Sequence, residues 1–152
     1  MNYIEEAIIE AKKGTKEKEG GPFGCVIIKD GKIISKAHNT VLKTNDCTNH
    51  AEMNAIRKAC KKLETFNLKK CQLYTTTYPC PMCLGAILWS GIEAMYYLTT
   101  SNDVKKIGFD DAKYYDFYKG KNKRMLETTK TQQPKIKKEF TTFLSKYKGK
   151  KY

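Results

Sequence analysis

Apolar residues near the start of the chain recur at the spacing of an amphipathic helix. The repeating positions are Ile4, Ala7, Ile8 and Ala11. This periodicity predicts a helix over residues 3–13, ended by Gly14 and a charged linker. The Gly-Gly-Pro run at residues 20–22 then predicts a turn into a sheet, because glycine and proline interrupt regular elements.

A β-hairpin is predicted next. Residues 23–29 and 32–37 have the composition of strands, and the Asp30-Gly31 pair between them favours a two-residue turn. The two strands are therefore predicted to pair in antiparallel orientation. Residues 38–49 are polar and rich in Asn and Thr, so we expect a loop there, with substrate contacts on it.

Helical and strand patterns alternate in the middle of the chain. Helices are predicted from His50 through residue 60 and over residues 80–89, and strands over residues 71–77 and 93–98. A strand, helix, strand order implies a parallel crossover with the helix packed on the sheet. The chain thus predicts a mixed sheet with helices, in one domain spanning residues 1–152.

The last third of the chain has weaker patterns. Residues 101–107 favour a short helix, and residues 108–111, Gly-Phe-Asp-Asp, favour a loop. Further along, Phe140, Phe143 and Leu144 lie at helical spacing and predict a terminal helix.

Composition narrows the class of protein. The chain has 152 residues, and hydrophobic residues make up 40% of it, which supports a packed core. It contains neither an apolar run of membrane-spanning length nor an N-terminal export signal, so we expect a cytoplasmic protein without a membrane partner. In that compartment its six cysteines are interpreted as reduced thiols and metal ligands.

The formal net charge of +13 raises the question of a nucleic-acid partner. Nearly all the basic residues are lysines, with Arg57 and Arg124 the only arginines. Recognition of bases and phosphates relies on the planar fork of arginine. A solvated lysine surface is therefore favoured over a nucleic-acid footprint, which stays open as the alternative.

Four residues of the middle segment have the spacing of a catalytic zinc site. His50 stands two residues before Glu52, and Cys80 and Cys83 form a Cys-x-x-Cys pair thirty residues later. Zinc prefers nitrogen and sulfur donors, and catalytic sites keep three protein ligands and one position for water. His50, Cys80 and Cys83 supply three ligands, and Glu52 is then the candidate base.

The predicted helices favour this assignment. Residues two apart do not share a helix face, so Glu52 is unsuited to be a fourth ligand beside His50. Pro81 suits the first turn of a helix, which places Cys80 and Cys83 at a helix N-terminus. That end of a helix stabilises thiolates, the form that binds metal.

The Cys-x-x-Cys pair has two other interpretations, a structural zinc site and a redox motif. A structural zinc site requires a fourth ligand, which Cys47 or Cys71 could supply. A redox motif leaves His50 and Glu52 unexplained. Both are less favoured than the catalytic site.

The His-x-Glu and Pro-Cys-x-x-Cys motifs are the signature of zinc deaminases. Together with further segments, they make the chain similar to the bacterial guanine deaminases, a branch of the cytidine deaminase superfamily. The further segments are Gly20-Gly21-Pro22-Phe23-Gly24, Thr44-Asn45-Asp46, Leu84-Gly85-Ala86-Ile87, Trp89 and Gly108-Phe109-Asp110-Asp111.

The resemblance implies an α/β fold: a three-layer α/β/α sandwich with a mixed five-stranded sheet. It also implies hydrolysis of guanine to xanthine and ammonia. His50, Cys80 and Cys83 match the zinc ligands, and Glu52 matches the residue that shuttles protons. Asp111 matches the carboxylate that assists departure of the amine, with Asp110 as the alternative.

The same resemblance implies contacts to a small purine base. Asn39 matches an asparagine that hydrogen-bonds the base, Ala51 matches a further contact, and Phe23 and Trp89 match aromatic walls. Phe23 and Trp89 could equally be packing residues. Tyr152 matches a terminal residue that closes the pocket of the partner in a homodimer with exchanged C-terminal segments.

The chain departs from the family pattern at Tyr78, where Glu or Ser usually precedes Pro-Cys, and at Gly91, where relatives often have arginine. These differences keep other substrates open. The alternatives are a nucleoside such as guanosine, adenosine in tRNA, and a nucleic-acid-binding module with structural zinc.

Overall fold

The computed structural model describes residues 2–121 and 125–149 of the chain. The elements, in chain order, are α1 (Tyr3–Lys16), β1 (Gly24–Lys29), β2 (Lys32–His38), α2 (Val41–Thr44), α3 (Ala51–Leu63), β3 (Cys71–Thr77), α4 (Pro81–Trp89), β4 (Ala94–Thr99), α5 (Ser101–Lys105), α6 (Ala112–Tyr118) and α7 (Pro134–Lys146).

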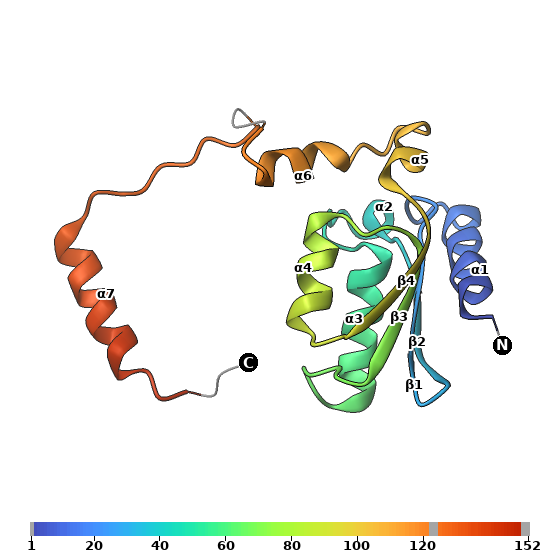
Figure 1. Ribbon diagram of the computed structural model, residues 1–152, viewed down its shortest axis with the longest axis horizontal. Helices are drawn as coiled ribbons and strands as arrows, with labels where there is room; N and C mark the ends of the chain where they lie inside the picture. The colour runs from blue at the N-terminus through green and yellow to red at the C-terminus, as the bar shows by residue number, and fades with distance from the viewer. Residues whose placement is uncertain (1, 122–124, 150–152) are drawn as a thin grey trace.

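The sheet is mixed and has the strand order β2-β1-β3-β4. β1 is antiparallel to β2 and β3, whereas β3 and β4 are parallel and are joined through α4. Figure 1 shows α1 on one face of this sheet and α3 and α4 on the other. The predicted three-layer arrangement, hairpin and parallel crossover are therefore confirmed.

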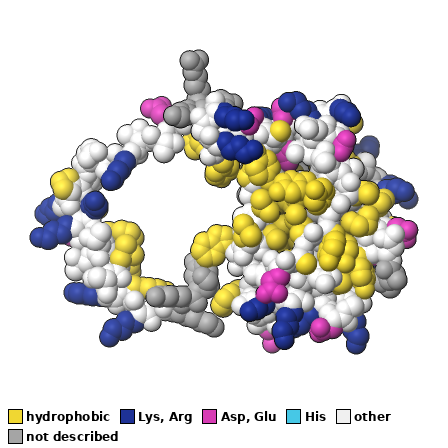
Figure 2. Space-filling view, viewed as in Figure 1, with side chains coloured by type: hydrophobic (Ala, Val, Ile, Leu, Met, Phe, Trp, Pro, Cys, Tyr) yellow, Lys and Arg dark blue, Asp and Glu magenta, His cyan; other side chains and the backbone are white. Residues whose placement is uncertain are grey.

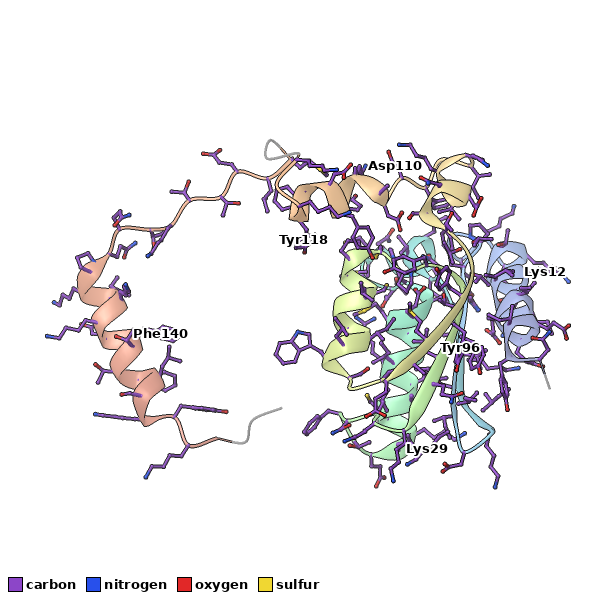
Figure 3. The ribbon with its side chains drawn as sticks, viewed as in Figure 1. Lys12, Lys29, Tyr96, Asp110, Tyr118 and Phe140 are labelled. Atoms are coloured by element: carbon purple, nitrogen blue, oxygen red, sulfur yellow. The ribbon has the colours of Figure 1, made fainter. Side chains whose placement is uncertain are left out.

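The implied fifth strand is not found among the described residues, which form a four-stranded sheet. The reason lies immediately after β4. Thr100 and Asp103 form a capping box that starts α5, so the chain turns away from the edge of the sheet. β4 is left as an edge strand, and its residues Tyr96, labelled in Figure 3, Tyr97 and Leu98 are exposed.

Alternation along β1 divides the core between the two faces of the sheet. Cys25 and Ile27 pack in the larger cluster with α3, and Val26 and Ile28 pack in a second cluster with Ala7 of α1. All four side chains are buried, as expected for a central strand covered on both faces. This double cover fixes the sheet against which α3 and its functional residues pack.

The predicted hairpin turn and the predicted end of the first helix have different outcomes. Asp30 and Gly31 both adopt positive φ, as a tight hairpin turn requires, so that prediction is confirmed. The predicted end of the first helix at Gly14 is wrong, since α1 continues to Lys16. Gly14 instead makes room for the ring of His38, because a Cβ at this position would lie 2.6 Å from the His38 Cδ2.

The C-terminal part of the chain is an arm. α6 covers the end of α4, and a long extended segment then carries α7 away from the sheet (Figure 1). The apolar residues Phe140, Phe143 and Leu144 of α7 are at least half exposed. Figure 2 shows hydrophobic side chains on the inner side of this arm and on the body opposite it. None of the described helices has the length and apolar character needed to cross a membrane.

Candidate active site

The three predicted metal ligands meet where two helices begin. His50 is the residue before α3, Cys80 is the residue before α4, and Cys83 lies in the first turn of α4. His50 Nδ1 is 3.6 Å from the Sγ of Cys80 and 3.6 Å from the Sγ of Cys83. Helices with their positive ends at one point stabilise the thiolates that bind metal.

These distances fit zinc. A tetrahedral ion with Zn–S bonds of about 2.3 Å and Zn–N bonds of about 2.05 Å separates a sulfur from a nitrogen by about 3.6 Å. Within the described residues the cluster has three donors. Cys71 lies in the core and Cys47 is exposed, and neither joins the cluster. The arrangement thus matches a catalytic site better than a structural site with four ligands.

Ionisation of the cluster agrees with metal binding. Hydrogen bonds from Cys83 and His50 lower the pKa of Cys80 to about 4, against the effect of burial. The hydrogen bond to Cys80 and burial raise the pKa of Cys83. The hydrogen bond with Cys80 raises the pKa of His50. Because zinc binds the deprotonated forms of cysteine and histidine, binding of the ion would displace protons from this cluster.

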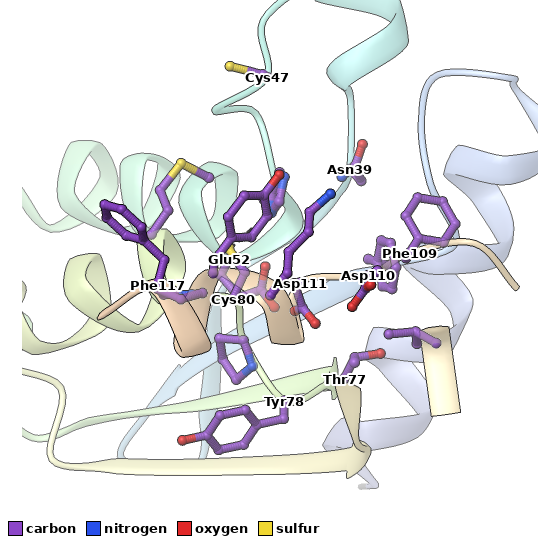
Figure 4. Close-up of a pocket in the computed structure, with 18 of the residues that line it drawn as sticks. Asn39, Cys47, Glu52, Thr77, Tyr78, Cys80, Phe109, Asp110, Asp111 and Phe117 are labelled. Atoms are coloured by element: carbon purple, nitrogen blue, oxygen red, sulfur yellow. Dashed lines mark hydrogen bonds between the residues drawn. The ribbon is translucent and has the colours of Figure 1, made fainter. Parts of the chain in front are cut away.

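Glu52 lies in the first turn of α3 with only 5% of its surface exposed. Thr75 of β3 donates a hydrogen bond of 2.7 Å to the Glu52 Oε1. Burial raises the pKa of Glu52, and the Thr75 hydrogen bond opposes that shift. The carboxylate is therefore oriented by the sheet through its Oε1 atom. Figure 4 shows Glu52 beside Cys80 and Asp111.

A cavity of about 680 Å³ opens over the cluster. Phe23, Asn39 and Asp111 line it together with His50, Glu52 and Cys80, so these predicted residues are brought together. Phe109 meets the Phe23 ring edge to face, with centroids 4.9 Å apart. Phe23 is thus both a wall of the cavity and a packing residue.

The side chain of Asn39 is held by the backbone around it. Its Oδ1 accepts hydrogen bonds from the N–H groups of Gly21, at 3.3 Å, and Val41, at 3.1 Å. Because its oxygen is used internally, the Asn39 amide offers its N–H donors to the cavity. Asn39 is only 4% exposed, so its orientation is fixed by packing.

The two aspartates of the 108–111 loop have different surroundings. Asp110 Oδ2 lies 3.3 Å from Lys105 Nζ, whereas Asp111 lies near the Cys80 and His50 side chains. Each has a buried Oδ1 without a hydrogen-bond partner among the described residues. Burial raises the pKa of Asp111, and the Cys80 thiolate adds to the shift. Asp111 is therefore the better placed to accept a hydrogen bond from a ligand over the metal cluster.

Three predicted contacts do not line the cavity in the described chain. Trp89 is 74% exposed at the far end of α4, so the single chain does not use it as a wall. Ala51 is fully buried in the core beneath the site. Tyr152 lies outside the described residues. The substrate roles of these residues stay predictions.

Aromatic residues on α6 were not predicted as part of the site. Tyr114, Phe117 and Tyr118 line the cavity, together with Tyr78 after β3. Their signal was the dense aromatic run at residues 114–118, which lacks the periodicity of an ordinary amphipathic helix. Also on α6, Tyr115 donates a 2.7 Å hydrogen bond to the Pro79 carbonyl, next to the ligand Cys80.

Comparisons with known proteins agree with this site. A model of the "Cytidine and deoxycytidylate deaminase zinc-binding region" matches residues 1–99. The chain is 48% identical over 113 residues to the guanine deaminase of Bacillus subtilis, covering 74% of this chain and 72% of that protein.

Two further similarities bear on the substrate. The crystal structure of the Bacillus subtilis guanine deaminase matches with a TM-score of 0.90 at 39% identity, over 100% of this chain and 99% of the other. The chain is also 46% identical to a tRNA-specific adenosine deaminase from Aquifex aeolicus, over 95 residues covering 62% of each protein.

Proposed function

The chain belongs to the cytidine and deoxycytidylate deaminase family, and we propose that it deaminates guanine hydrolytically, forming xanthine and ammonia. His50, Cys80 and Cys83 hold zinc in this proposal, and their spacing fits the ion. When bound, zinc acts as a Lewis acid that makes water nucleophilic at neutral pH.

One observation carries the choice of guanine. The matched family region ends at residue 99, but the cavity is completed by residues beyond it, including Phe109, Asp111 and Phe117. The similarity to the Bacillus subtilis guanine deaminase covers the whole chain and therefore includes these residues. The similarity to the tRNA deaminase covers 62% of the chain.

The side chains of the cavity have complementary roles toward a flat purine. Phe23 supplies an apolar face, and the donors of the Asn39 amide match the acceptor edge of guanine, where O6 and N7 lie. Asp111 accepts hydrogen bonds from the exocyclic amine. Guanine is thereby oriented with its amino-bearing carbon over the metal cluster.

Glu52 moves the protons. It takes one proton from the attacking water and gives it to the ring nitrogen, and it then carries the second proton, from the hydroxyl formed on the attacked carbon, to the leaving amine. Thr75 keeps Oε1 in place during these transfers, through its 2.7 Å hydrogen bond. General acid and base groups need this hydrogen-bond reach and a fixed orientation.

We also propose a homodimer in which the C-terminal segments are exchanged and Tyr152 closes the partner's pocket. The cavity of about 680 Å³ is larger than a free base needs, and the arm reaches away from its own body. The apolar residues Phe140 and Phe143 on α7 and Leu88 and Trp89 on α4 are exposed in the single chain. Large exposed apolar surfaces of this kind mark interfaces. The cysteines of the proposed zinc site must stay reduced to bind metal, and this requirement favours a cytoplasmic location for the protein.

Adenosine in tRNA is the second candidate, because of the 46% identity to the Aquifex aeolicus enzyme and the net charge of +13. The deciding experiment measures ammonia release by the zinc-loaded protein from guanine, guanosine, adenine, cytosine and an anticodon stem-loop RNA. We expect turnover of guanine alone. Turnover of the RNA alone would replace guanine as the substrate, and silence on every substrate would favour the binding module with structural zinc.

A further inference from the structure

A buried histidine outside the cavity lies between carboxylates of two different segments. His38, at the end of β2, is 9% exposed at its side chain. Its Nδ1 is 3.1 Å from an oxygen of Glu10 on α1, and its Nε2 is 2.9 Å from an oxygen of Glu19 in the loop before β1. The proposed reaction does not use any of these three side chains.

Carboxylate oxygens at both ring nitrogens favour the doubly protonated ring. A neutral imidazole has one N–H, so one of the two carboxylates would face a nitrogen lone pair. An imidazolium donates to both carboxylates in charge-assisted hydrogen bonds. Three other charged groups face the cluster: Lys43 of α2 bonds Glu19, Lys36 of β2 lies near Glu10, and a Glu17 oxygen lies within 4.8 Å of the ligand atoms of Glu19 and His38. Three carboxylates beside two lysines favour a third cation.

The cluster is joined directly to the substrate side of the cavity. Glu19 is followed by Gly20 and Gly21, and the Gly21 N–H donates to Asn39 Oδ1 at 3.3 Å. The backbone N–H of Asn39 in turn donates a 3.1 Å hydrogen bond to the backbone carbonyl of Phe23. A Cβ at Gly20 would overlap Asn39, so this loop lies directly on the asparagine.

Hydrogen bonds to backbone carbonyls also connect the Glu19 loop to α2 and the end of β2 to α3. The Lys43 N–H donates to the Glu19 carbonyl at 2.9 Å, while its ammonium group bonds the Glu19 carboxylate. Asn54 of α3 donates to the His38 carbonyl at 3.1 Å. The loop before β1, the end of β2 and α2 are therefore held together around His38.

We propose that His38, as an imidazolium, is a positioning residue that fixes the Glu19 loop so that Phe23 and the Asn39 amide face the base. Loss of its second proton releases Glu19 and loosens base binding. The metal ligands and Glu52 stay in place, because α3 and α4 hold them. This proposal rests on the proposed function, since its readout is binding of guanine.

The first test separates KM from kcat. Glu19→Ala should raise KM for guanine about tenfold with kcat per bound zinc nearly unchanged, because base contacts act equally in ground and transition states. The matched control is Glu6→Gln. Its 2.9 Å ion pair with Lys36, which also lies near Glu10, joins α1 to β2 without touching the loop. Its KM should stay that of the wild type.

Glu19→Gln supplies a pH readout that a purely structural role would not change. Its amide can pair with a neutral imidazole, so the ratio of its KM to the wild-type KM should fall as pH rises from about 6 to 9. Use of the ratio cancels ionisation of guanine itself. A KM for Glu19→Ala equal to that of the wild type, or a ratio that does not change with pH, would overturn the proposal.

A direct measurement does not depend on any substrate. The chain has two histidines, and in zinc-loaded protein the ¹⁵N signals of the ligand His50 are separate from those of His38. We expect both His38 ring nitrogens to carry protons at pH 7. A neutral tautomer there would overturn the proposal even if guanine is turned over. Wild-type protein that is inactive on guanine, with an imidazolium at His38, would locate the failure in the proposed function instead.

Discussion

The body of the molecule, up to β4, and the segment that follows it are held in very different ways. In the body, β1, β3 and the first turn of α3 are buried, and they position Glu52 and the metal cluster. After β4, Val104 is the only buried hydrophobic residue among those described. Yet the later segment supplies Phe109, Asp111 and the α6 aromatics to the cavity.

The residues proposed for catalysis and metal binding therefore lie mainly in the body, whereas many residues that line the cavity lie in the later segment. The body carries Glu52 and the metal cluster, and the matched family region ends with it. The segment after β4 lines the cavity and supplies none of the three cluster donors, so a change there leaves the metal cluster in place. Loops on a rigid scaffold have this division of work in many enzymes.

The largest expected effect comes from the body. Glu52→Ala should lower kcat for guanine by about 100- to 10,000-fold, the range of a lost general acid or base. Zinc content, measured by atomic emission, should stay at that of the wild type, because the three donors are separate residues. Activity close to the wild-type value would remove Glu52 from the mechanism.

A smaller effect should separate the two aspartates of the later segment. Asp111→Asn should lower kcat about 100-fold, because a preorganised acceptor at the leaving amine is lost. Asp110→Asn is the matched control, since Asp110 is paired with Lys105. Steady-state kinetics of both variants test the assignment, and a larger loss for Asp110→Asn would exchange the roles.

Removing residues 147–152 should reduce kcat/KM about tenfold, because an exchanged segment that excludes water would be lost. Zinc content and circular dichroism should not change, since both core clusters are formed by residues up to Met95. Normal turnover by the truncated chain would end the proposal that Tyr152 closes the pocket. Light scattering on the full chain tests the dimer separately.

The smallest effect is one of stability. Hydrogen bonds from Lys43 and His38 lower the pKa of Glu19 to about 2 in the folded chain, below its ordinary value of 4.5. A lowered pKa stabilises the folded state above pH 4.5, and this contribution is lost as pH falls toward 2. The melting temperature of Glu19→Gln should therefore lie below that of the wild type at pH 6 and approach it near pH 2. A constant difference across this range would contradict the assigned pKa.

The sequence predicted the body of the molecule better than the segment after β4. The motifs around His50, Glu52 and Cys80 were informative because zinc chemistry demands particular donors at helix ends. The hairpin at Asp30 was informative because few residues accept its backbone geometry.

The errors lie where tertiary contacts decide. Gly14 has the residue type of a helix end, but only the fold shows that the His38 ring needs its space. The prediction of a fifth strand was wrong because the capping box at Thr100 starts a helix after β4. The role of Trp89 as an aromatic wall stays a prediction, because contacts with a second subunit are not set by the local sequence pattern.

The most direct test of the account compares two substrates on the same zinc-loaded preparation. Guanine and an anticodon stem-loop RNA are incubated with the full chain, and xanthine and inosine are quantified by chromatography. The account predicts xanthine from guanine, lost in Glu52→Ala, and no inosine in the RNA. Inosine without xanthine would contradict it and would show that the segment after β4 selects a polynucleotide.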